Sequence, residues 1–284
     1  MINPSPLRYP GGKFKTYNYI KSIIETNQCT SYIEPFAGGA AVGISLLIND
    51  DVERVIINDF DRSIYAFWHS VIYNSEELIS RINNTSITIE EREKQKKIQI
   101  DKQSSDLIDL GFSTLFLNRV NRSGIIKGGV IGGKNQDGKY KLDCRFNKDK
   151  LIKKIRLIAS KQDRIDVYNQ NALDFIGNVI IGEEQSFTFF DPPYYDKGPS
   201  LYTNFYSHED HRELAETIIN NLQDYFWIVT YDHSTEIKAL YSELNSVEYY
   251  LNYSAQEKTK GVEYMFFSVN TNTSRPNHYL NLFG

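Results

Sequence analysis

Residues 187–194 read Phe187-Thr188-Phe189-Phe190-Asp191-Pro192-Pro193-Tyr194. The first four residues form an apolar, β-favouring run, which predicts a buried strand. The last four therefore lie at the carboxyl end of that strand, where open α/β sheets bind ligands. The Asp191 carboxylate and the Pro192 carbonyl can each accept one hydrogen from an exocyclic amine, and the Tyr194 ring can stack on the attached base. The alternative interpretation is a strand that ends in a proline turn.

Strand-like and helix-like runs alternate along most of the chain, which predicts an α/β fold with a largely parallel sheet. The predicted strands are residues 31–34, 52–57, 165–168, 187–190, 226–230, 247–253 and 264–269, with a turn at 257–261. The predicted helices are residues 40–48, 64–71, 148–160 and 208–222.

The α/β alternation stops between about residues 75 and 150. Residues 82–102 are polar and charged, with salt-bridge spacing on a predicted helix, and residues 113–118 predict a second helix. Two glycine pairs in residues 124–138 predict a loop or hairpin. The predicted domains are a catalytic domain of residues 1–74 and 151–284 and an inserted, mainly helical subdomain of residues 75–150.

The charge of the chain is unevenly distributed. The net charge is −4, yet residues 112–156 contain twelve basic and three acidic residues, a local net charge of +9. A polyanion would be drawn to this segment and repelled by most of the remainder. The alternative is a solvated basic face that has no partner.

Residues 31–59 have the pattern of half a nucleotide-binding fold. A strand, a loop with Gly38, a helix and an acid at the end of the next strand follow one another, and Asp59 lies 21 positions after Gly38. The glycine lets the backbone approach a ligand, and the acid accepts hydrogen bonds from ribose hydroxyls. Because neither pyrophosphate-binding glycine motif is present, a nucleoside without phosphates fits better than a dinucleotide, which disfavours a dinucleotide-dependent oxidoreductase.

Before the first strand, the segment Tyr9-Pro10-Gly11-Gly12-Lys13 offers an aromatic face and a cation that can meet a carboxylate. A helix cap with a surface lysine is the alternative. The two cysteines match no metal motif, the N-terminal residues lack the apolar stretch typical of a signal peptide, and no apolar run approaches ~18 residues. We therefore expect a cytoplasmic protein without a metal.

Four motifs, taken in order, resemble those of the Dam-like, D12-class DNA adenine-N6 methyltransferases. They are Tyr9–Lys13, Glu34–Gly38, Asn58-Asp59 and, after a basic insertion, Asp191–Tyr194. The resemblance extends from residue 5 to about residue 270. It implies a Rossmann-like methyltransferase sheet with helices on both faces and an inserted DNA-recognition subdomain. It also implies methyl transfer from S-adenosyl-L-methionine to N6 of a flipped adenine in duplex DNA, leaving S-adenosyl-L-homocysteine.

The resemblance also assigns roles to residues. Lys13 would serve the methionine end of the cofactor and Asp59 its ribose, while Asp174 would meet its amino group and Phe175 its ring. The full set of expected cofactor contacts is Tyr9, Gly11, Gly12, Lys13, Glu34, Phe36, Gly38, Asp59, Asp174, Phe175 and Asp191. The family's Phe-x-Gly-x-Gly is replaced by Phe36-Ala37-Gly38-Gly39-Ala40, and we expect binding to be retained because alanine is only one methyl larger.

Catalysis is expected from Asp191, Pro192, Pro193 and Tyr194, because accepting both amine hydrogens favours a more tetrahedral nitrogen aimed at the methyl group. A base in a duplex must flip out to reach them, and residues 195–206 are a candidate lid. The expected DNA contacts are Asn118, Arg119, Arg122, Lys127, Lys134, Lys139, Lys141 and Lys197. Arg119 and Arg122 can read base edges or bind only phosphate, and both options stay open.

Two alternatives remain at this point. One is the same chemistry on cytosine N4 or on an adenine in RNA, although the aspartate of the motif favours adenine in this resemblance. Another is a catalytically silent DNA-binding relative. The expected partner is double-stranded DNA, and a restriction endonuclease acting on the same site is a further candidate in a prokaryotic or phage setting.

Overall fold

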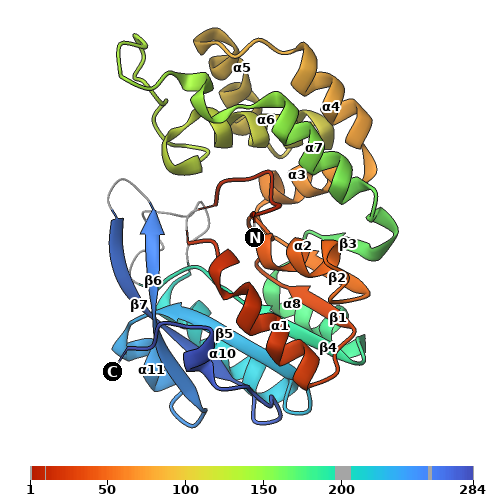
Figure 1. Ribbon diagram of the computed structural model, residues 1–284, viewed down its shortest axis with the longest axis vertical. Helices are drawn as coiled ribbons and strands as arrows, with labels where there is room; N and C mark the ends of the chain where they lie inside the picture. The colour runs from red at the N-terminus through yellow and green to blue at the C-terminus, as the bar shows by residue number, and fades with distance from the viewer. Residues whose placement is uncertain (1, 10, 196–205, 255–257, 284) are drawn as a thin grey trace.

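The computed structural model describes residues 2–9, 11–195, 206–254 and 258–283. Within these residues the centre is a seven-stranded sheet with the order β3-β2-β1-β4-β5-β7-β6 (Figure 1). The strands are β1 (Ser31–Glu34), β2 (Arg54–Asn58), β3 (Ile165–Tyr168), β4 (Ser186–Phe190), β5 (Phe226–Asp232), β6 (Ser246–Ser254) and β7 (Lys258–Phe267). Strands β1 to β5 are parallel, and β7 is antiparallel to both β5 and β6.

The strand order reverses between β1 and β4. The chain moves outward from β1 to β2 and β3, and then returns to place β4 on the other side of β1. Ile33 of β1 lies beside Ile56 of β2 and Thr188 of β4. Such a reversal leaves a crevice outside the carboxyl ends of two adjacent strands, which is where α/β sheets bind ligands. The segment after β4 therefore begins at the binding edge of the sheet.

Ten α-helices surround the described strands. They are α1 (Tyr17–Thr26), α2 (Ala41–Ile48), α3 (Arg62–Tyr73), α4 (Ser75–Asn84), α5 (Ile89–Ile100), α6 (Leu107–Val120), α7 (Lys148–Ala159), α8 (Ala172–Asn178), α10 (His208–Asn221) and α11 (Thr235–Leu240). Short 3-10 turns are η1 (Phe14–Thr16), η2 (Arg122–Gly124), η3 (Leu142–Arg145), η4 (Gln162–Arg164), η5 (Ile180–Gly182) and η6 (Pro276–His278). None of these described helices combines the length and apolar character that a membrane crossing requires.

Two apolar clusters cover the two faces of the sheet. Phe187 and Phe189 of β4 belong to the cluster that includes side chains of α1, α2 and α3. Phe190 belongs to the other cluster, with side chains of α8, α10 and α11. Because successive side chains of a strand point to opposite faces, this one strand contributes to both cores. The arrangement confirms the predicted α/β sheet with helices on both faces.

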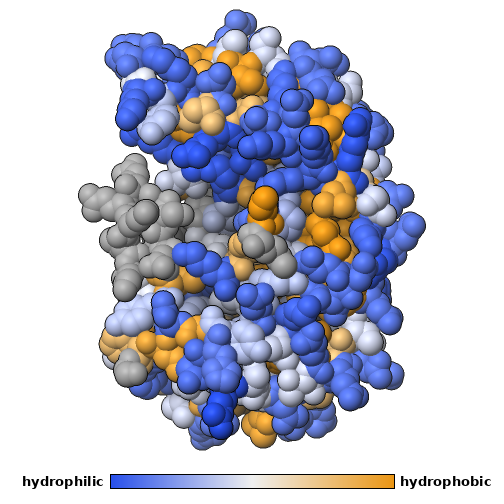
Figure 2. Space-filling view, viewed as in Figure 1, coloured by the Kyte–Doolittle hydropathy of each residue, from blue (hydrophilic) through white to orange (hydrophobic). Residues whose placement is uncertain are grey.

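Helices α4, α5 and α6 form a helical unit that lies above the sheet in Figure 1. Its visible surface is mainly hydrophilic (Figure 2). Helix α6 packs along α3, and α4 packs against α7, so the two helices that flank the unit in sequence join it to the sheet. One apolar cluster runs without a break from Phe187 of β4 to Leu117 of α6. The domain boundaries at residues 75 and 150 stay predictions.

Two sequence-based expectations differ from the structure, and one of two forms left open for a loop is selected. Helix α6 begins at Leu107, well before the predicted residues 113–118, because burial on nearly every side removes the polar face that reveals a helix. Of the loop or hairpin predicted for residues 124–138, the structure has the loop: this stretch contains no described strand, and a single bridge between Asn121 and Val130 closes it. The turn predicted at 257–261 is wrong over 258–261, because β7 already begins at Lys258; residue 257 lies outside the described residues.

Helices α1, α4, α8 and α11 were not predicted as separate helices. Both α8 and α11 are short, at 7 and 6 residues, so the periodicity of their apolar residues spans fewer than two full turns. Their caps are nevertheless regular: the side chains of Asn171 and Ser234 accept from the backbone N–H groups of Leu173 and Ile237. These caps satisfy donors that the first turn of a helix leaves open.

We predict that Gly111→Ala destabilises the protein by about 1–3 kcal/mol. A Cβ at position 111 of α6 would lie 2.5 Å from the carbonyl oxygen of Ala66 on α3 and would also collide with the hydroxyl of Ser70. The gain of about 1 kcal/mol that alanine normally brings to a helix is therefore outweighed. Urea unfolding of the purified variant measures the difference.

The matched control is Gly177→Ala in α8, where a Cβ meets nothing within 4 Å. This variant should gain about 0.5–1 kcal/mol, because glycine loses more conformational entropy on folding than alanine does. Equal effects of the two substitutions would contradict the close packing of α6 on α3.

Candidate functional site

Asp191 follows β4 directly, at the sheet edge between the ends of β1 and β5. Its Oδ1 accepts hydrogen bonds from the Lys13 ammonium at 2.6 Å and from the Thr230 hydroxyl at 2.9 Å. Its side chain is 27% exposed, and the described residues contain no hydrogen-bond partner for Oδ2. One carboxylate oxygen is therefore fixed by the protein, while the other stays able to accept a hydrogen from a ligand.

Lys13 is the cation of this site, and its side chain is only 3% exposed. Besides Asp191, its ammonium donates to the carbonyl of Gly11 at 3.2 Å and to the hydroxyl of Tyr194 at 3.1 Å. It lies 3.6 Å from the carboxylate of Glu263. Burial by itself would lower the pKa of Lys13, but the charges of Asp191 and Glu263 raise it above its ordinary value. Lys13 is therefore charged, and it joins the N-terminal segment to the end of β4.

Glu263 of β7 has a fully buried side chain, and the sequence analysis did not identify it. Its carboxylate accepts hydrogen bonds from the hydroxyls of Tyr194 at 2.5 Å and Tyr249 at 2.6 Å. Glu263 pairs in register with Asp232 at the carboxyl end of β5, because β7 runs antiparallel to β5. In the sequence, Glu263 is an acid that precedes the apolar end of the last strand. It could have been predicted as a site residue only if β7 were known to run antiparallel to β5.

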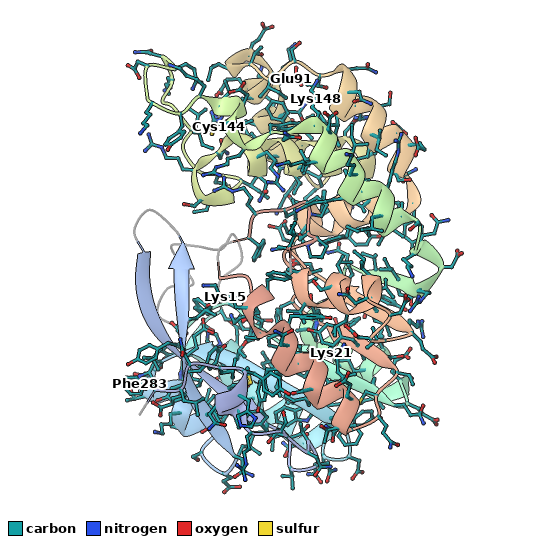
Figure 3. All side chains as sticks on the ribbon, viewed as in Figure 1. Lys15, Lys21, Glu91, Cys144, Lys148 and Phe283 are labelled. Carbon is teal, nitrogen blue, oxygen red and sulfur yellow. The ribbon has the colours of Figure 1, made fainter. Side chains whose placement is uncertain are left out.

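Lys15, two residues after Lys13, faces a different part of the molecule. Lys15 lies in η1, just before α1 and beside β6 (Figure 3). It lines a cavity of about 290 Å³ together with Tyr250 and residues of the C-terminal segment. None of the predicted site residues lines that cavity, so we place the candidate site at the end of β4.

Tyr194 was expected to offer its ring to a flipped base. The ring is almost completely buried, with the Lys13 ammonium 5.0 Å from its centroid. The next residue, Tyr195, donates its backbone N–H to Asp232 at 2.9 Å. A base can reach the face of Tyr194 only when a neighbouring part of the chain moves aside. The predicted lid at 195–206 falls mostly on residues 196–205, which lie outside the described residues.

The loop after β1 is built around Gly38. Its backbone N–H donates to Asp59 Oδ2 at 2.9 Å, and its carbonyl accepts from the Trp68 indole at 2.9 Å. Gly38 has a φ of +45°, and a Cβ there would lie 2.6 Å from the ring of Tyr9. Glycine is therefore required at this position, and the structure brings Tyr9, Gly38 and Asp59 together. Burial raises the pKa of Asp59 to about 7.

The departure from the family's glycine pattern falls at Ala40, which has a φ of +42°. The left-handed conformation disfavours an L-residue by roughly 1–2 kcal/mol, yet the loop retains it immediately before α2. At the start of the same loop, Glu34 is buried and accepts hydrogen bonds from the Tyr32 hydroxyl and the Gly43 N–H, both at 3.0 Å. Burial raises the pKa of Glu34 to about 7.

The remaining expected cofactor contacts surround the ends of β1 and β3. Phe36 is partly buried and packs edge-on against Tyr206. Asp174 is exposed in the first turn of α8. The neighbouring Phe175 is fully buried, with its ring 5.5 Å from that of Tyr168. Asp174 is thus accessible to a ligand, whereas Phe175 belongs to the core in this conformation.

The expected DNA contacts separate into two groups. Asn118 is buried and holds both backbone groups of Arg8 as well as the Gly124 carbonyl, so its amide is used within the protein. Arg119 donates to the Pro6 carbonyl. The exposed group consists of Arg122, Lys127, Lys134, Lys139 and Lys141. Lys197 lies outside the described residues.

Four cations, which we call the basic cluster, gather beside the N-terminal segment: Arg8, Arg119, Arg145 and Lys154. Burial, then repulsion from Arg8 and Arg145, lowers the pKa of Arg119 to about 10. Burial and the charge of Arg119 lower the pKa of Lys154 to about 8. In the part of the chain that is described, Nη1 of Arg8 and Nε of Arg119 are buried without a hydrogen-bond partner. Cys144, the residue before Arg145, is labelled in Figure 3 in the helical unit above the sheet.

No group of three or more His, Cys, Asp or Glu side chains within the described ranges is arranged to hold a metal ion. The acceptors at the strand ends instead suit a nucleoside. The carboxylates of Asp59 and Asp174 can accept from hydroxyl and amino groups, and the loop at Gly38 lets the backbone come close.

A model of the D12 class N6 adenine-specific DNA methyltransferases matches residues 9–259. The chain is also similar to curated Type II methyltransferases. It is 26% identical to M.MjaIII of Methanocaldococcus jannaschii over 66% of this chain and 68% of that protein. It is 26% identical to M1.LlaDCHI of Lactococcus lactis subsp. cremoris over 73% and 72%, and 22% identical to M.CviBI of Paramecium bursaria Chlorella virus NC1A over 74% and 76%.

We predict that Glu34→Gln removes part of the pH dependence of stability. The folded-state pKa of about 7 lies above the ordinary value of 4.5, so between these values the folded protein holds a proton that the unfolded chain has lost. The stabilisation is present below pH 4.5 and is lost as the pH rises through about 7, by roughly 3 kcal/mol. Glutamine keeps the acceptor oxygen for Tyr32 and Gly43 but does not titrate.

The measurement is the free energy of unfolding in urea at several pH values from 4.5 to 7.5, for both proteins. Other titrating groups act equally in the two proteins, so the difference isolates residue 34. Parallel curves for the wild type and the variant would contradict the raised pKa of Glu34.

Proposed function

Because the chain belongs to the D12 class of N6 adenine-specific DNA methyltransferases, we propose that its reaction centre is Asp191-Pro192-Pro193-Tyr194 at the end of β4. The chain is thus a DNA adenine methyltransferase, and its family implies S-adenosylmethionine as the methyl donor. The observation that carries the proposal is the asymmetry of Asp191, whose Oδ1 is held by Lys13 and Thr230 while Oδ2 has no described partner.

The proposed task of these residues is to position the adenine amine. Oδ2 of Asp191 accepts one N–H hydrogen and the Pro192 carbonyl accepts the other, which turns the nitrogen lone pair out of the purine ring system. The bound cofactor supplies an activated methyl group on a sulfonium. Formation of the N–C bond would break the methyl–sulfur bond and leave S-adenosyl-L-homocysteine, while the carboxylate of Asp191 stabilises the positive charge that develops on nitrogen. The methylated amine would then release one proton to solvent water. Positioning and electrostatics therefore carry the rate.

We propose that the cofactor lies across the ends of β1, β2 and β4. Asp59 takes the ribose hydroxyls, and Asp174 takes the adenine amino group above the buried Phe175. Tyr9, Gly11, Gly12, Glu34, Phe36 and Gly38 shape the remaining wall. Lys13 already faces the carboxylates of Asp191 and Glu263, so the methionine carboxylate would be a third anion beside one ammonium. Because three carboxylates would share one ammonium, we propose that the methionine end of the cofactor also contacts the backbone of residues 11–13.

We propose that the basic cluster binds the phosphate backbone next to the flipped adenine. Its support is physical: four cations repel one another, and no acidic side chain appears among the groups that shift the pKa values of Arg119 and Lys154. An anion would relieve the repulsion and satisfy the unpaired donors of Arg8 and Arg119. The exposed residues Arg122, Lys127, Lys134, Lys139 and Lys141, together with Lys197, supply further contacts to DNA.

The domain boundaries and partners are part of the same proposal. Residues 75–150 would serve as the target-recognition unit between the two catalytic segments, 1–74 and 151–284. The curated relatives are named Type II methyltransferases, which supports a restriction endonuclease acting on the same DNA site as a functional partner.

We predict that Asp191→Asn lowers the rate of methyl transfer by about 100-fold or more. The amide presents a donor or a neutral acceptor where the amine needs a carboxylate. The assay incubates duplex DNA with methyl-labelled S-adenosylmethionine, and the DNA is then digested to nucleosides. The wild type should place the label in N6-methyladenine.

Asp224→Asn is the matched control, since Asp224 is exposed in the loop before β5, far along the chain from the proposed centre. It should leave the rate unchanged. Full turnover by Asp191→Asn would remove that residue from catalysis, and label in methylcytosine would assign the chemistry to another amine.

We also predict that Arg145→Ala and Lys154→Gln weaken DNA binding for all sequences alike. Each should reduce the slope of log K against log salt by about 1, because each variant releases about one counterion fewer. Fluorescence anisotropy with a labelled duplex at several salt concentrations measures both quantities.

The control for this series is Lys161→Gln. Lys161 pairs with Asp50 at 2.9 Å, at the opposite edge of the sheet near the start of β2, and its replacement should change neither affinity nor slope. Equal slopes for all three variants and the wild type would contradict a phosphate site at the basic cluster.

A further inference from the structure

We propose that Glu263 is a positioning residue of the methyl-transfer reaction, holding Lys13 and Tyr194 in the geometry that leaves Oδ2 of Asp191 facing the substrate. The proposal rests on the proposed function of Asp191. Glu263 itself touches neither the amine nor the methyl donor in this scheme, and it acts through the residues that do.

The contacts of Glu263 come from three separate parts of the chain. Oε1 accepts from the Tyr194 hydroxyl at 2.5 Å, and Oε2 accepts from the Tyr249 hydroxyl at 2.6 Å. Oε2 also lies 3.6 Å from the Lys13 ammonium. Both oxygens of one buried carboxylate are thereby assigned to separate partners, which fixes the orientation of the group.

Lys13 transmits this order to Asp191. Its ammonium has three donors, and the structure directs them to Oδ1 of Asp191, the hydroxyl of Tyr194 and the carbonyl of Gly11. Glu263 attracts the same ammonium from 3.6 Å, and in this proposal that attraction restrains the ammonium from moving to Oδ2 of Asp191. The charge of Glu263 thus keeps the Lys13–Asp191 contact on a single oxygen, and Thr230 completes that restraint at 2.9 Å.

A neutral side chain at position 263 would not have the same electrostatic effect on Lys13 and Asp191. Two carboxylates face one buried ammonium, so the group carries one excess negative charge, which acts on the Asp191 carboxylate as well as on Lys13. Burial raises the pKa of Asp191, and the charge of Glu263 adds to that rise. For Lys13, burial lowers the pKa, while the charges of Asp191 and then Glu263 raise it. Lys13 and Thr230 lower the pKa of Asp191. Beyond burial, the charge of Asp191 in turn raises the pKa values of Glu34 and Tyr32. If Glu263 acts through its charge, its replacement changes the pH dependence of kcat, whereas the loss of a packing contact alone does not.

The test compares Glu263→Gln with Tyr249→Phe, using steady-state methyl transfer to duplex DNA at saturating cofactor from pH 5 to 9. Glu263→Gln keeps the size and one acceptor oxygen but loses the charge. We expect kcat to fall at least about 10-fold with little change in the KM for DNA. We also expect the acidic limb of the kcat profile to move to lower pH, because Asp191 loses a neighbouring anion that raises its pKa.

Tyr249→Phe removes one hydrogen bond to Glu263 but keeps its charge. We expect kcat to fall several-fold while the acidic limb stays in place, and thermal unfolding should show that this variant folds. If Glu263→Gln does not fold, Tyr249→Phe still tests the proposal, because an unchanged kcat in that variant would contradict it. Glu248→Gln on the same strand as Tyr249 is the matched control: Glu248 contacts His233 and Lys238, and its replacement should change neither kcat nor the profile.

The outcomes separate the two proposals. A wild-type protein that transfers no methyl group to DNA would contradict the proposed function. An active wild type with folded variants that keep both kcat and the acidic limb would overturn the role of Glu263 and leave Asp191 untouched. A lower kcat in Glu263→Gln with an unshifted limb would mean that Glu263 acts only as packing, which also overturns the proposal.

Discussion

The buried ammonium of Lys13 is the charge on which the candidate site depends. It lies between the carboxylates of Asp191 and Glu263, at 2.6 and 3.6 Å. Without it, two like charges would be buried close together, and each would resist ionisation. Because Lys13 precedes the first helix, Asp191 ends β4 and Glu263 belongs to β7, one cation connects the start, the middle and the end of the chain at a single edge of the sheet.

The sequence predicted those features whose physical cause is local. An apolar run followed at once by Asp191 indicates a strand end with a polar site, and β4 has that form. The unit from Glu34 to Asp59 was equally readable, because strand, glycine loop, helix and acid are adjacent in the chain; the structure joins Gly38 to Asp59 by a hydrogen bond of 2.9 Å. Composition and periodicity were sufficient for the sheet and for most of its helices.

Features that depend on distant packing could not be read in the same way. Glu263 reaches the site because β7 inserts between β5 and β6 and runs antiparallel to both, and no local pattern states that order. Residue type also did not reveal exposure. Asn118 is used to hold Arg8, and the rings of Tyr194 and Phe175 are buried, although each was chosen for its ability to face a ligand. Arg145 and Lys154 belonged to the basic segment of residues 112–156 but were not among the expected DNA contacts, and Arg8 was not among them either, because only the fold brings these cations to Arg119.

A crystal structure of the protein with S-adenosylhomocysteine and a duplex that contains its recognition sequence would test the role of Asp191. We predict a flipped adenine with its N6 within about 3 Å of Oδ2 of Asp191 and of the Pro192 carbonyl, while Oδ1 stays on Lys13. An adenine amine bound elsewhere, or an Asp191 carboxylate with both oxygens on Lys13, would contradict it.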